Sequence, residues 1–600
     1  MNGNLRGSRA AGALSVLALL LYWGSLGNPL VFDDGQLAGA RFQRFDPASV
    51  LRFDLRWIST ATFGWVREAF GNEVLWQRFA NVLLHAMVAS VLFGFLRRLF
   101  AVLLPADARA AGWYALFGAL LFLAHPAAVY GVAYLIQRSI VMATLFGLLS
   151  LWLFLEGLLR NRSAWFIASA AAYLAAVFSK EHAVMLPAVA AALAVLLRDR
   201  SRQAWRPLAL AFALHAAIAV FVTLKAKGLL GVLYEPFAEA AVRQLAEPVG
   251  AAEKRTDAYA LSILNQGFLF VRYLATWLAP WPGWMSIDLR PAFPAQLLSW
   301  PQAAGFIAWL AWPLIAAALL LRRGPVGLAG FAMLAPWLLA LTEFAAVRIQ
   351  EMFVLYRSYL WMALLPAAIP AVLAGLRRRW AYALLAAAAI ALLPPCLDRL
   401  GSFSSDLRVW DDAVRKIADP GAPYADRSIR NRGVAYYKLE RYAEALRDFD
   451  QALALDPGNA KAWLLRGSLH MRAARSAQAR ADFDRALALE PRNAEVLGRR
   501  CVVLLRLQRL DEALADCSRA AELAPEDLDS YISLGMVRAL RGATAEAERH
   551  YRRALQMAPG ASIARYQYGV LLRGLGRMDE AQREFAAACA AGLRTACAPQ

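Results

Sequence analysis

The chain has 600 residues, of which 60% are hydrophobic and only 18% are charged, and its mean hydropathy is +0.41. This composition excludes an ordinary soluble protein of this size, so most of the chain is expected to lie in a bilayer. The net charge of +20 does not indicate nucleic-acid binding, because the arginines cluster between apolar runs rather than along one soluble face.

Apolar segments of bilayer-spanning length recur from about residue 10 to 395 and are separated by short polar loops. The first lacks a small-residue cleavage site, so we expect it to be an uncleaved signal anchor. Eleven spans are predicted, near residues 11–26, 79–96, 113–130, 139–158, 164–178, 183–198, 207–226, 303–321, 327–345, 355–374 and 378–395.

The distribution of arginine predicts the orientation of these spans. If the N-terminus is cytoplasmic, the arginine clusters occupy alternate loops, as the positive-inside rule requires. These clusters begin at Arg6, Arg97, Arg160, Arg198, Arg322 and Arg377. A twelfth apolar segment, 259–280, would place the Arg322 loop outside if it crossed the membrane, so we expect it to be re-entrant or interfacial. An odd number of crossings then places the C-terminal region outside the cytoplasm.

The last 200 residues are rich in Arg, Ala and Asp, and they repeat with a period of 34 residues. Prolines mark the period at Pro423, Pro457, Pro491, Pro525 and Pro559. This is the tetratricopeptide (TPR) period, in which small residues let paired helices approach and Pro ends the second helix. We therefore predict a membrane domain over 1–398, a linker or helix over 399–422 and about five TPRs over 423–600. Such repeats form a superhelix whose groove binds an extended peptide or a partner protein.

Four of the five cysteines lie in this repeat region. Cys501 interrupts a position that is otherwise glycine, at Gly433, Gly467, Gly535 and Gly569. Cys501 and Cys517 are predicted on the two helices of one repeat, while Cys589 and Cys597 flank a short tail. Outside the cytoplasm either pair could be oxidised, but buried packing of two thiols is the commoner explanation for the first pair.

Polar groups also occur where a membrane should not tolerate them. An ionisable group at membrane depth is costly unless it is paired or lines a wet cavity, so each such group is a functional candidate. The candidates are Asp33, Asp34, Asn81, His85, His125, Arg138, Lys180, Glu181, Arg272, Glu351 and Arg357. In the predicted topology nearly all lie in the outer half of the bilayer or at its outer edge. We therefore expect them to converge on one outward-facing cavity.

The order of these motifs resembles a known family. "FDD" follows the first span, "NVLLH" lies in the second, "HPAAVYGVAYLIQRS" joins the third and fourth, "SKE" joins the fifth and sixth, and "YRSYL" comes late in the membrane half. With the repeats, this order is similar to the TPR-containing transmembrane O-mannosyltransferases and their bacterial relatives, within the GT-C glycosyltransferases. The resemblance implies an all-α chain: a polytopic membrane helix bundle of GT-C type followed by a soluble TPR superhelix.

Two substitutions depart from this resemblance. Family members commonly have Gly-Arg or Gly-Arg-Lys where this chain has Gln137 and Arg138, and His-Arg or Glu-Arg where it has Tyr356 and Arg357. The arginines are retained, so the predicted phosphate ligands are retained too. The substitutions leave the identity of the sugar open.

The resemblance implies an inverting glycosyltransferase that takes a sugar from a polyprenyl-phosphate donor and transfers it to an acceptor hydroxyl, on protein, at the non-cytoplasmic face. The Ala- and Arg-rich composition suggests a bacterial inner membrane with the repeats in the periplasm. Asp33 would be the base, and Asp34 would orient it or the acceptor. On an extended loop these neighbours point in different directions, unlike the paired carboxylates of glycosidases.

The remaining candidates would hold the donor, since cations stabilise a departing phosphate. The expected roles are phosphate binding by Arg138, Lys180 and Arg357, pairing with or orientation of Lys180 by Glu181, sugar or phosphate binding by His125, and shaping of the cavity by Asn81 and His85. The donor's apolar tail would lie between spans, against 259–280. The sequence names no certain cofactor and leaves the metal requirement open; a divalent cation bound by Asp33, Asp34, His125 and His182 is an alternative.

Plainer interpretations stay open. The acidic pair could be only solvated, Asn81 and His85 could bond across helices, Lys180 and Glu181 could be an interfacial pair, and Arg357 could anchor a helix end. Rival functions are sugar transfer to a lipid or surface polysaccharide, a non-enzymatic TPR scaffold for envelope assembly, and a transporter. The outer concentration of charges argues against the last two.

Overall fold

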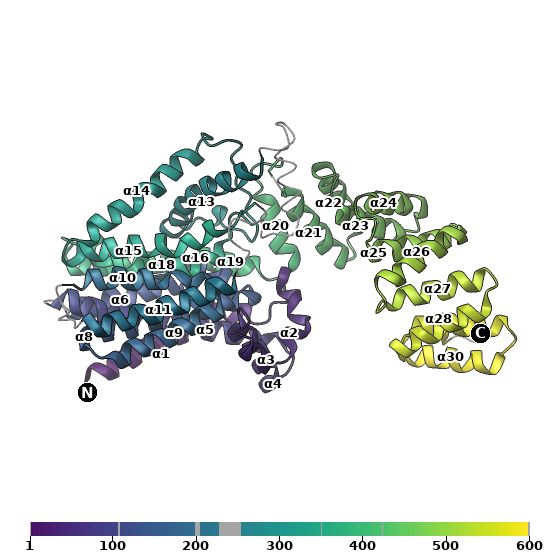
Figure 1. Ribbon diagram of the computed structural model, residues 1–600, viewed down its shortest axis with the longest axis horizontal. Coiled ribbons are helices and arrows are strands. Elements are labelled where there is room, and N and C mark those ends of the chain that lie inside the picture. Colours follow the sequence, from purple (N-terminus) through teal and green to yellow (C-terminus); the bar gives the residue numbers. More distant parts are fainter. Residues whose placement is uncertain are drawn as a thin grey trace. The chain divides into compact units, whose positions relative to one another are not determined.

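The computed structural model describes residues 2–105, 108–198, 205–226, 254–349, 351–422 and 424–597. It divides into two compact units, Met1–Tyr424 and Ala425–Gln600. Helices are the only regular elements of these described ranges, apart from one isolated bridge between Leu289 and Phe353. The all-α prediction is confirmed for the described part of the chain (Figure 1).

The first unit is a bundle of long apolar helices connected by short helical turns. Its longer helices are α1 (Asn2–Tyr22), α4 (Trp57–Phe70), α5 (Val74–Leu103), α6 (Ala108–Leu123), α8 (Arg138–Arg160), α9 (Ser163–Ser179), α10 (Leu186–Leu196), α11 (Trp205–Lys225), α13 (Lys254–Leu278), α14 (Gln302–Leu320), α15 (Gly324–Ala340), α16 (Leu355–Met362), α18 (Arg378–Ala391), α19 (Leu393–Ser402) and α20 (Asp406–Arg415). Its short α-helices are α2 (Ala40–Gln43), α3 (Pro47–Leu51), α7 (Val129–Val132) and α17 (Ile369–Val372). Among these, α5 packs against α1, α6 and α8, and α8 also packs against α9.

Six stretches of helix in the described residues are long and apolar enough to cross a membrane. They are Val74–Leu103, Leu135–Arg160, Trp205–Lys225, Gln302–Leu320, Gly324–Ala345 and Arg378–Ser402. A seventh is obtained if Arg109–Leu123 and Pro126–Val132, which meet at a bend of 52°, count as one span. Ser163–Ser179 and Glu181–Leu196 are apolar but shorter. The first unit is therefore consistent with a membrane domain, with fewer full-length spans than the eleven predicted.

Two sequence predictions need correction. The span predicted at 355–374 is not one helix, because α16 ends at Met362 and is followed by only short turns, η9 (Leu365–Ala368) and α17. Pro366 explains the break, since its ring clashes with the carbonyl four residues earlier and it donates no hydrogen bond. The segment 259–280 does not turn back on itself, because almost all of it belongs to the single continuous helix α13. An interfacial position for α13 stays a prediction.

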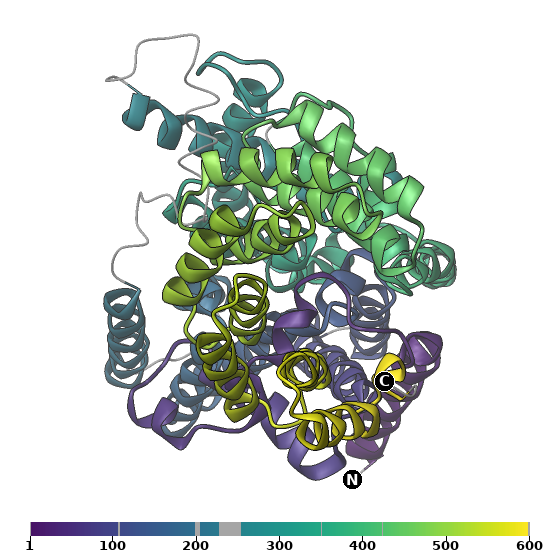
Figure 2. The ribbon, with the colours of Figure 1, turned by 90° about the vertical axis from the view of Figure 1, so that its right-hand side faces the viewer.

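The second unit consists of five helix pairs that follow one another in a curved array (Figure 2). The pairs are α21 (Ala425–Lys438) with α22 (Tyr442–Leu455), α23 (Ala460–Arg472) with α24 (Ser476–Leu489), α25 (Ala494–Arg506) with α26 (Leu510–Leu523), α27 (Leu528–Leu540) with α28 (Thr544–Met557), and α29 (Ser562–Gly574) with α30 (Met578–Ala590). Five helix pairs match the number of repeats that the 34-residue period predicts. Pro423, the first proline of the period, lies outside the described residues.

A glycine on the first helix of a pair allows the second helix to approach closely. In the second repeat a Cβ added at Gly467 would stand 2.7 Å from the ring of Phe483, which is too close for any larger residue without a shift. The first, fourth and fifth repeats have the same arrangement. In the third repeat a disulfide between Cys501 and Cys517 takes this place, so the interpretation of this pair as packed reduced thiols is wrong. A second disulfide joins Cys589 to Cys597 after α30.

Candidate active site

A cavity of about 480 Å³ lies in the first unit, where several helix ends and turns meet. Its wall is built by segments far apart in the sequence, including the turn after α1, the start of α4, the α9–α10 junction and the region before α16. Polar and charged side chains on this wall are Asp33, Gln36, Arg56, Ser59, Thr60, Gln137, Ser139, Lys180, Glu181, His182, Thr223, Thr342, Arg348, Glu351, Tyr356 and Arg357. Of the predicted candidates, the cavity thus gathers Asp33, Lys180, Glu181, Glu351 and Arg357.

The acidic pair lies on η2 (Phe32–Ala38), a 3-10 helix rather than the expected extended loop. The half-buried Asp33 lines the cavity, and its Oδ2 accepts a hydrogen bond of 2.9 Å from the Tyr134 hydroxyl. Asp34 is fully buried, and its Oδ1 accepts one of 2.9 Å from the backbone N–H of Ile136. Burial raises the pKa of Asp34 from 3.8 to about 7. The neighbours therefore do face different partners, and only Asp33 reaches the cavity.

Lys180 is the cation of this cavity that has no carboxylate partner among the described residues. Its side chain is nearly buried, its Nζ donates a 2.9 Å hydrogen bond to Gln137 Oε1, and the ammonium lies 4.8 Å from the centre of the Tyr356 ring. A neutral amide and an aromatic face orient the charge without neutralising it. The ammonium is therefore available to a negatively charged ligand.

The predicted pairing of Glu181 with Lys180 is wrong. Both carboxylate oxygens of Glu181 accept hydrogen bonds from Arg56, through Nε at 2.8 Å and through Nη2. The backbone explains the difference: Lys180 is extended, with φ −159° and ψ 128°, so that consecutive side chains point to opposite sides. Arg56 is absent from the predicted site because it follows the first span in a region that reads as an ordinary polar loop.

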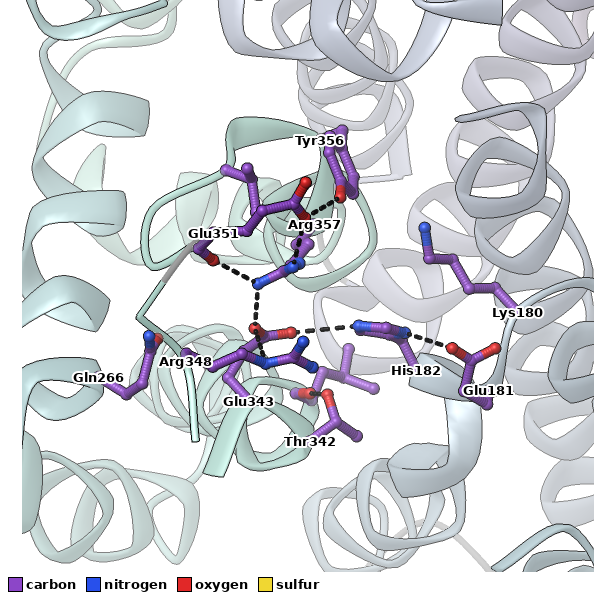
Figure 3. A network of polar contacts seen from close by, with 12 residues as sticks. Lys180, Glu181, His182, Gln266, Thr342, Glu343, Arg348, Glu351, Tyr356 and Arg357 are labelled. Carbon is purple, nitrogen blue, oxygen red and sulfur yellow. Dashed lines mark hydrogen bonds and ion pairs between the residues drawn. The ribbon is translucent and has the colours of Figure 1, made fainter. Parts of the chain in front are cut away.

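Glu343 lies at the centre of a buried ionic network that was not predicted from the sequence (Figure 3). Its Oε2 accepts a 2.8 Å hydrogen bond from Arg357 Nη1 and lies 3.7 Å from Arg348 Nε, and its Oε1 is 3.2 Å from His182 Nε2. Arg357 Nη2 also donates to Glu351 Oε2 at 3.1 Å. A signal was present, because Glu343 is an ionisable residue inside the predicted span 327–345.

Arg138, predicted to bind phosphate, is not on the cavity wall. Its guanidinium is fully buried and donates to Asn81 Oδ1 at 2.6 Å, to the Gln77 carbonyl and Oε1 at 2.8 Å, and to Thr62 Oγ1 at 3.3 Å. It also stacks 3.8 Å from the centre of the Phe63 ring. With its donors directed at α4 and α5, Arg138 fixes the start of α8 instead of facing a ligand.

The other predicted ligands also hold the protein together. Asn81 Nδ2 donates 3.1 Å to the Val132 carbonyl. His85 contacts the Tyr359 hydroxyl at 2.6 Å and the Leu123 carbonyl at 3.0 Å, so it bonds across helices as one open interpretation proposed. His125 stacks on Trp277, with ring centres 4.1 Å apart. None of these three residues lies on the cavity wall. They influence the shape of the cavity indirectly, because they fix the segment around 123–138.

The alternative metal site receives no support from the geometry. The part of the chain that the structure describes contains no group of three or more His, Cys, Asp or Glu side chains that could hold a metal ion. Asp33 and His182 both line the cavity, whereas Asp34 and His125 do not. Arg272, another candidate, lies with its guanidinium 5.2 Å from the centre of the Phe353 ring and is not on the wall.

Comparisons with known proteins concern the second unit. Residues 428–459 match a family model described as tetratricopeptide repeat, and residues 465–527 and 535–592 match another with the same description. No curated protein matches the chain.

Three similar solved structures each share 28% of this chain. PilF of Pseudomonas aeruginosa is 21% identical over 77% of its own chain, with a TM-score of 0.26. TTC0263, a TPR protein of Thermus thermophilus, is 24% identical over 92%, with a TM-score of 0.26. YrrB, a TPR protein with an unusual peptide-binding site, is 24% identical over 85%, with a TM-score of 0.24. The matched family models and the five helix pairs together show that the C-terminal unit contains tetratricopeptide repeats.

Proposed function

We propose that this protein is a membrane glycosyltransferase that transfers a sugar from a polyprenyl-phosphate donor to the hydroxyl of a protein acceptor. The observation that carries the proposal is the juxtaposition of Asp33, Lys180 and Arg357 around one cavity, although more than 140 residues separate each from the next in sequence. The family resemblance of the motifs supplies the reaction class.

Asp33 suits the role of base. Its carboxylate lines the cavity and accepts a hydrogen bond from the Tyr134 hydroxyl, and an ionised carboxylate can accept several hydrogen bonds, so one from a substrate hydroxyl is compatible with this contact. In the proposed step the acceptor oxygen attacks the anomeric carbon, the bond from that carbon to the phosphate oxygen breaks, and Asp33 takes the hydroxyl proton. The bond electrons leave with the polyprenyl phosphate, and the configuration of the sugar inverts.

Lys180 is the strongest candidate for the phosphate ligand. Its ammonium has no carboxylate partner among the described residues, while the guanidinium groups of Arg56 and Arg357 are each paired with glutamates. A desolvated cation aimed at the charge that develops on a leaving phosphate stabilises the transition state. Arg357 and Arg56 add positive potential and hold the glutamates away from the donor.

The repeat unit suits an acceptor that is a protein, because TPR grooves bind peptides or partner proteins. Its two disulfides favour an oxidising compartment. We therefore place the repeats and the opening of the cavity on the periplasmic side of a bacterial inner membrane, with the N-terminus in the cytoplasm.

The test is transfer of labelled sugar from polyprenyl phosphate by the purified full-length protein in lipid nanodiscs. Asp33→Asn should lower kcat by at least about a thousandfold, because the amide cannot take a proton. Lys180→Ala should lower kcat/KM for the polyprenyl-phosphate donor by about a hundredfold, because the leaving phosphate loses its cation. Glu73→Gln, an exposed change outside the cavity, is the control. Equal transfer by Asp33→Asn and the unchanged protein would refute the proposed base.

A non-enzymatic TPR scaffold is the second candidate, and the tetratricopeptide repeats, which bind peptides or partner proteins, favour it. It predicts that Asp33→Asn and Lys180→Ala leave partner capture intact in cells while groove substitutions abolish it. Transfer to a lipid or polysaccharide instead of protein would appear as labelled product in the organic or polysaccharide fraction, with the same dependence on Asp33.

A further inference from the structure

Helix α20, which follows the last apolar segment, contacts the start of η2, the 3-10 helix that carries Asp33. Residues 399–422 are predicted to be a linker or helix, but α19 and α20 belong to the first unit. Val409, Trp410 and Ala413 of α20 are buried in the core of that unit. This helix is therefore an integral part of the first unit and, among the described residues, the last helix before the repeats.

The contact is made through Phe32, the residue before Asp33. Asp406, at the first position of α20, accepts a 3.3 Å hydrogen bond from the Phe32 backbone N–H through Oδ1. The Trp410 ring meets the Phe32 ring edge to face, with centres 4.9 Å apart. The Tyr134 ring stacks on Phe32 at 5.9 Å, and the Tyr134 hydroxyl also binds Asp33. Asp406 thus helps to fix Phe32, the first residue of η2, although the two are 374 positions apart in sequence.

The backbone of Phe32 needs such support. Its φ is +51°, in the left-handed region that costs free energy for any residue with a Cβ and is rare for a bulky side chain. A residue keeps this conformation only when its surroundings impose it. A change of φ at Phe32 would redirect Asp33, because the two are adjacent.

The C-terminal end of α20 is anchored as firmly as its start. Asp412 accepts hydrogen bonds from Arg399 Nη1 at 2.9 Å and from Lys416 Nζ at 2.6 Å. Arg399 and Lys416 both donate to the Met285 carbonyl, at 2.8 Å and 2.7 Å. The helix is therefore held at both ends, so it can act as a fixed support for η2.

We propose that Trp410 and Asp406 are positioning residues for η2, so that the site is completed by a helix that follows the last apolar segment of the first unit. This inference rests on the proposed function only for its effect on catalysis; its structural part can be tested without any substrate. The expected loss arises from misdirection of Asp33, since displacement of a catalytic group by about 1 Å can cost about a hundredfold in rate.

The experiment compares Trp410→Ala, Trp410→Phe and Asp406→Ala in the full-length protein, with Trp380→Ala as a control on an exposed tryptophan. Hydrogen exchange is measured for peptides covering residues 30–39, where the Asp34 N–H donates to the Val31 carbonyl at 3.0 Å. Trp410→Ala and Asp406→Ala should raise exchange there severalfold, while α8 and α9 stay protected. Trp410→Phe should behave like the unchanged protein, because the edge contact is retained.

The transfer assay supplies the second readout. Trp410→Ala should lower kcat by about ten- to a hundredfold with little change in KM for the donor, because Asp33 and not Lys180 is displaced. Unchanged exchange at 30–39 in both alanine variants would overturn the positioning role, whatever the activity. Raised exchange in a chain whose unchanged form transfers no sugar would support the positioning role and refute the proposed function. Asp406→Ala, which removes the hydrogen bond from the Phe32 N–H, keeps the test usable if Trp410→Ala fails to fold.

Discussion

The two units use ion pairs in opposite ways. In the repeat unit the pairs recur with the period of the sequence: Arg432 with Asp448, Arg466 with Asp482 and Arg500 with Asp516 are each separated by 16 residues. Among the described residues of the first unit the pairs follow no period, and Arg56 lies 125 residues from its partner Glu181. Because the repeats contain several equivalent ion pairs, the loss of one pair should have a small effect. Because the charged side chains of the first unit converge on one place, the loss of one of them should disturb the others.

The difference follows from the solvent around each pair. The arginines of the repeats retain partial exposure, 21% for Arg466, so water screens their charge and limits what each pair contributes. Glu343 and Arg357 are 4% and 5% exposed, so neither can be left alone without a large desolvation penalty. Ionic groups that are buried and converge on a cavity indicate a site, whereas periodic pairs with a partly exposed arginine indicate architecture.

The largest expected effect tests the buried network. Glu343→Gln should destabilise the first unit by about 3–5 kcal/mol, because Arg357, Arg348 and His182 lose a shared anion in a buried setting. Thermal unfolding in detergent, followed by tryptophan fluorescence, measures this loss. Glu351→Gln is the matched control: its side chain is 29% exposed, so it should cost about 1 kcal/mol. Equal effects of the two changes would remove the contrast between the units.

The buried acid beside the base should make stability depend on pH. Because the pKa of Asp34 is raised from 3.8 to about 7, its protonated form stabilises the fold fully below about pH 4, and this contribution disappears as pH rises through 7. The loss amounts to as much as about 4 kcal/mol. Asp34→Asn, which keeps an acceptor for the Ile136 N–H, should abolish the slope. Unfolding at pH 5 and pH 8 tests this, with Glu73→Gln as the control.

In the third repeat the Cys501–Cys517 disulfide replaces the contact between glycine and an aromatic ring that the other repeats have. Its removal should destabilise mainly this repeat. Cys501→Ala with Cys517→Ala should cost about 3 kcal/mol, the amount expected for a closed loop of this length. Cys501→Gly with Cys517→Phe should recover part of this loss, since it recreates the contact of Gly467 with Phe483. Hydrogen exchange of α25 and α26 in the full chain gives the measurement. The Cys589→Ser, Cys597→Ser variant should leave these helices unaffected.

The smallest effect is expected for a single periodic pair. Arg466→Ala removes hydrogen bonds of 2.7 Å to both Asp482 and Asp450, but partial exposure limits the loss to about 0.5–1 kcal/mol. The loss should shrink further in high salt, because the pair is screened. Limited proteolysis of the repeat unit at low and high salt measures this loss as the difference in cleavage rate between the variant and the unchanged protein. A loss comparable to that of Glu343→Gln would contradict the comparison.

Features that are periodic or local along the chain could be predicted from the sequence alone. The 34-residue spacing predicted five repeats, because each repeat buries the same small and aromatic positions against its neighbour. Apolar runs predicted helices such as α5, α8, α11 and α14, because backbone groups in an apolar setting must bond within their own helix. The acidic pair after α1 and Lys180 were also recognisable, since a charge beside a membrane span is costly and therefore rare.

Which of these charges meet is a property of the folded chain. Arg138 has the residue type of a phosphate ligand, yet its guanidinium is consumed by Asn81 and Gln77, and Glu181 pairs with Arg56 instead of its neighbour Lys180. Phe32 is held by α20, whose residue Asp406 accepts its N–H although the two residues are 374 positions apart in sequence. Such partnerships depend on how helices pack in three dimensions, and no spacing along the chain encodes the distance between two side chains on different helices.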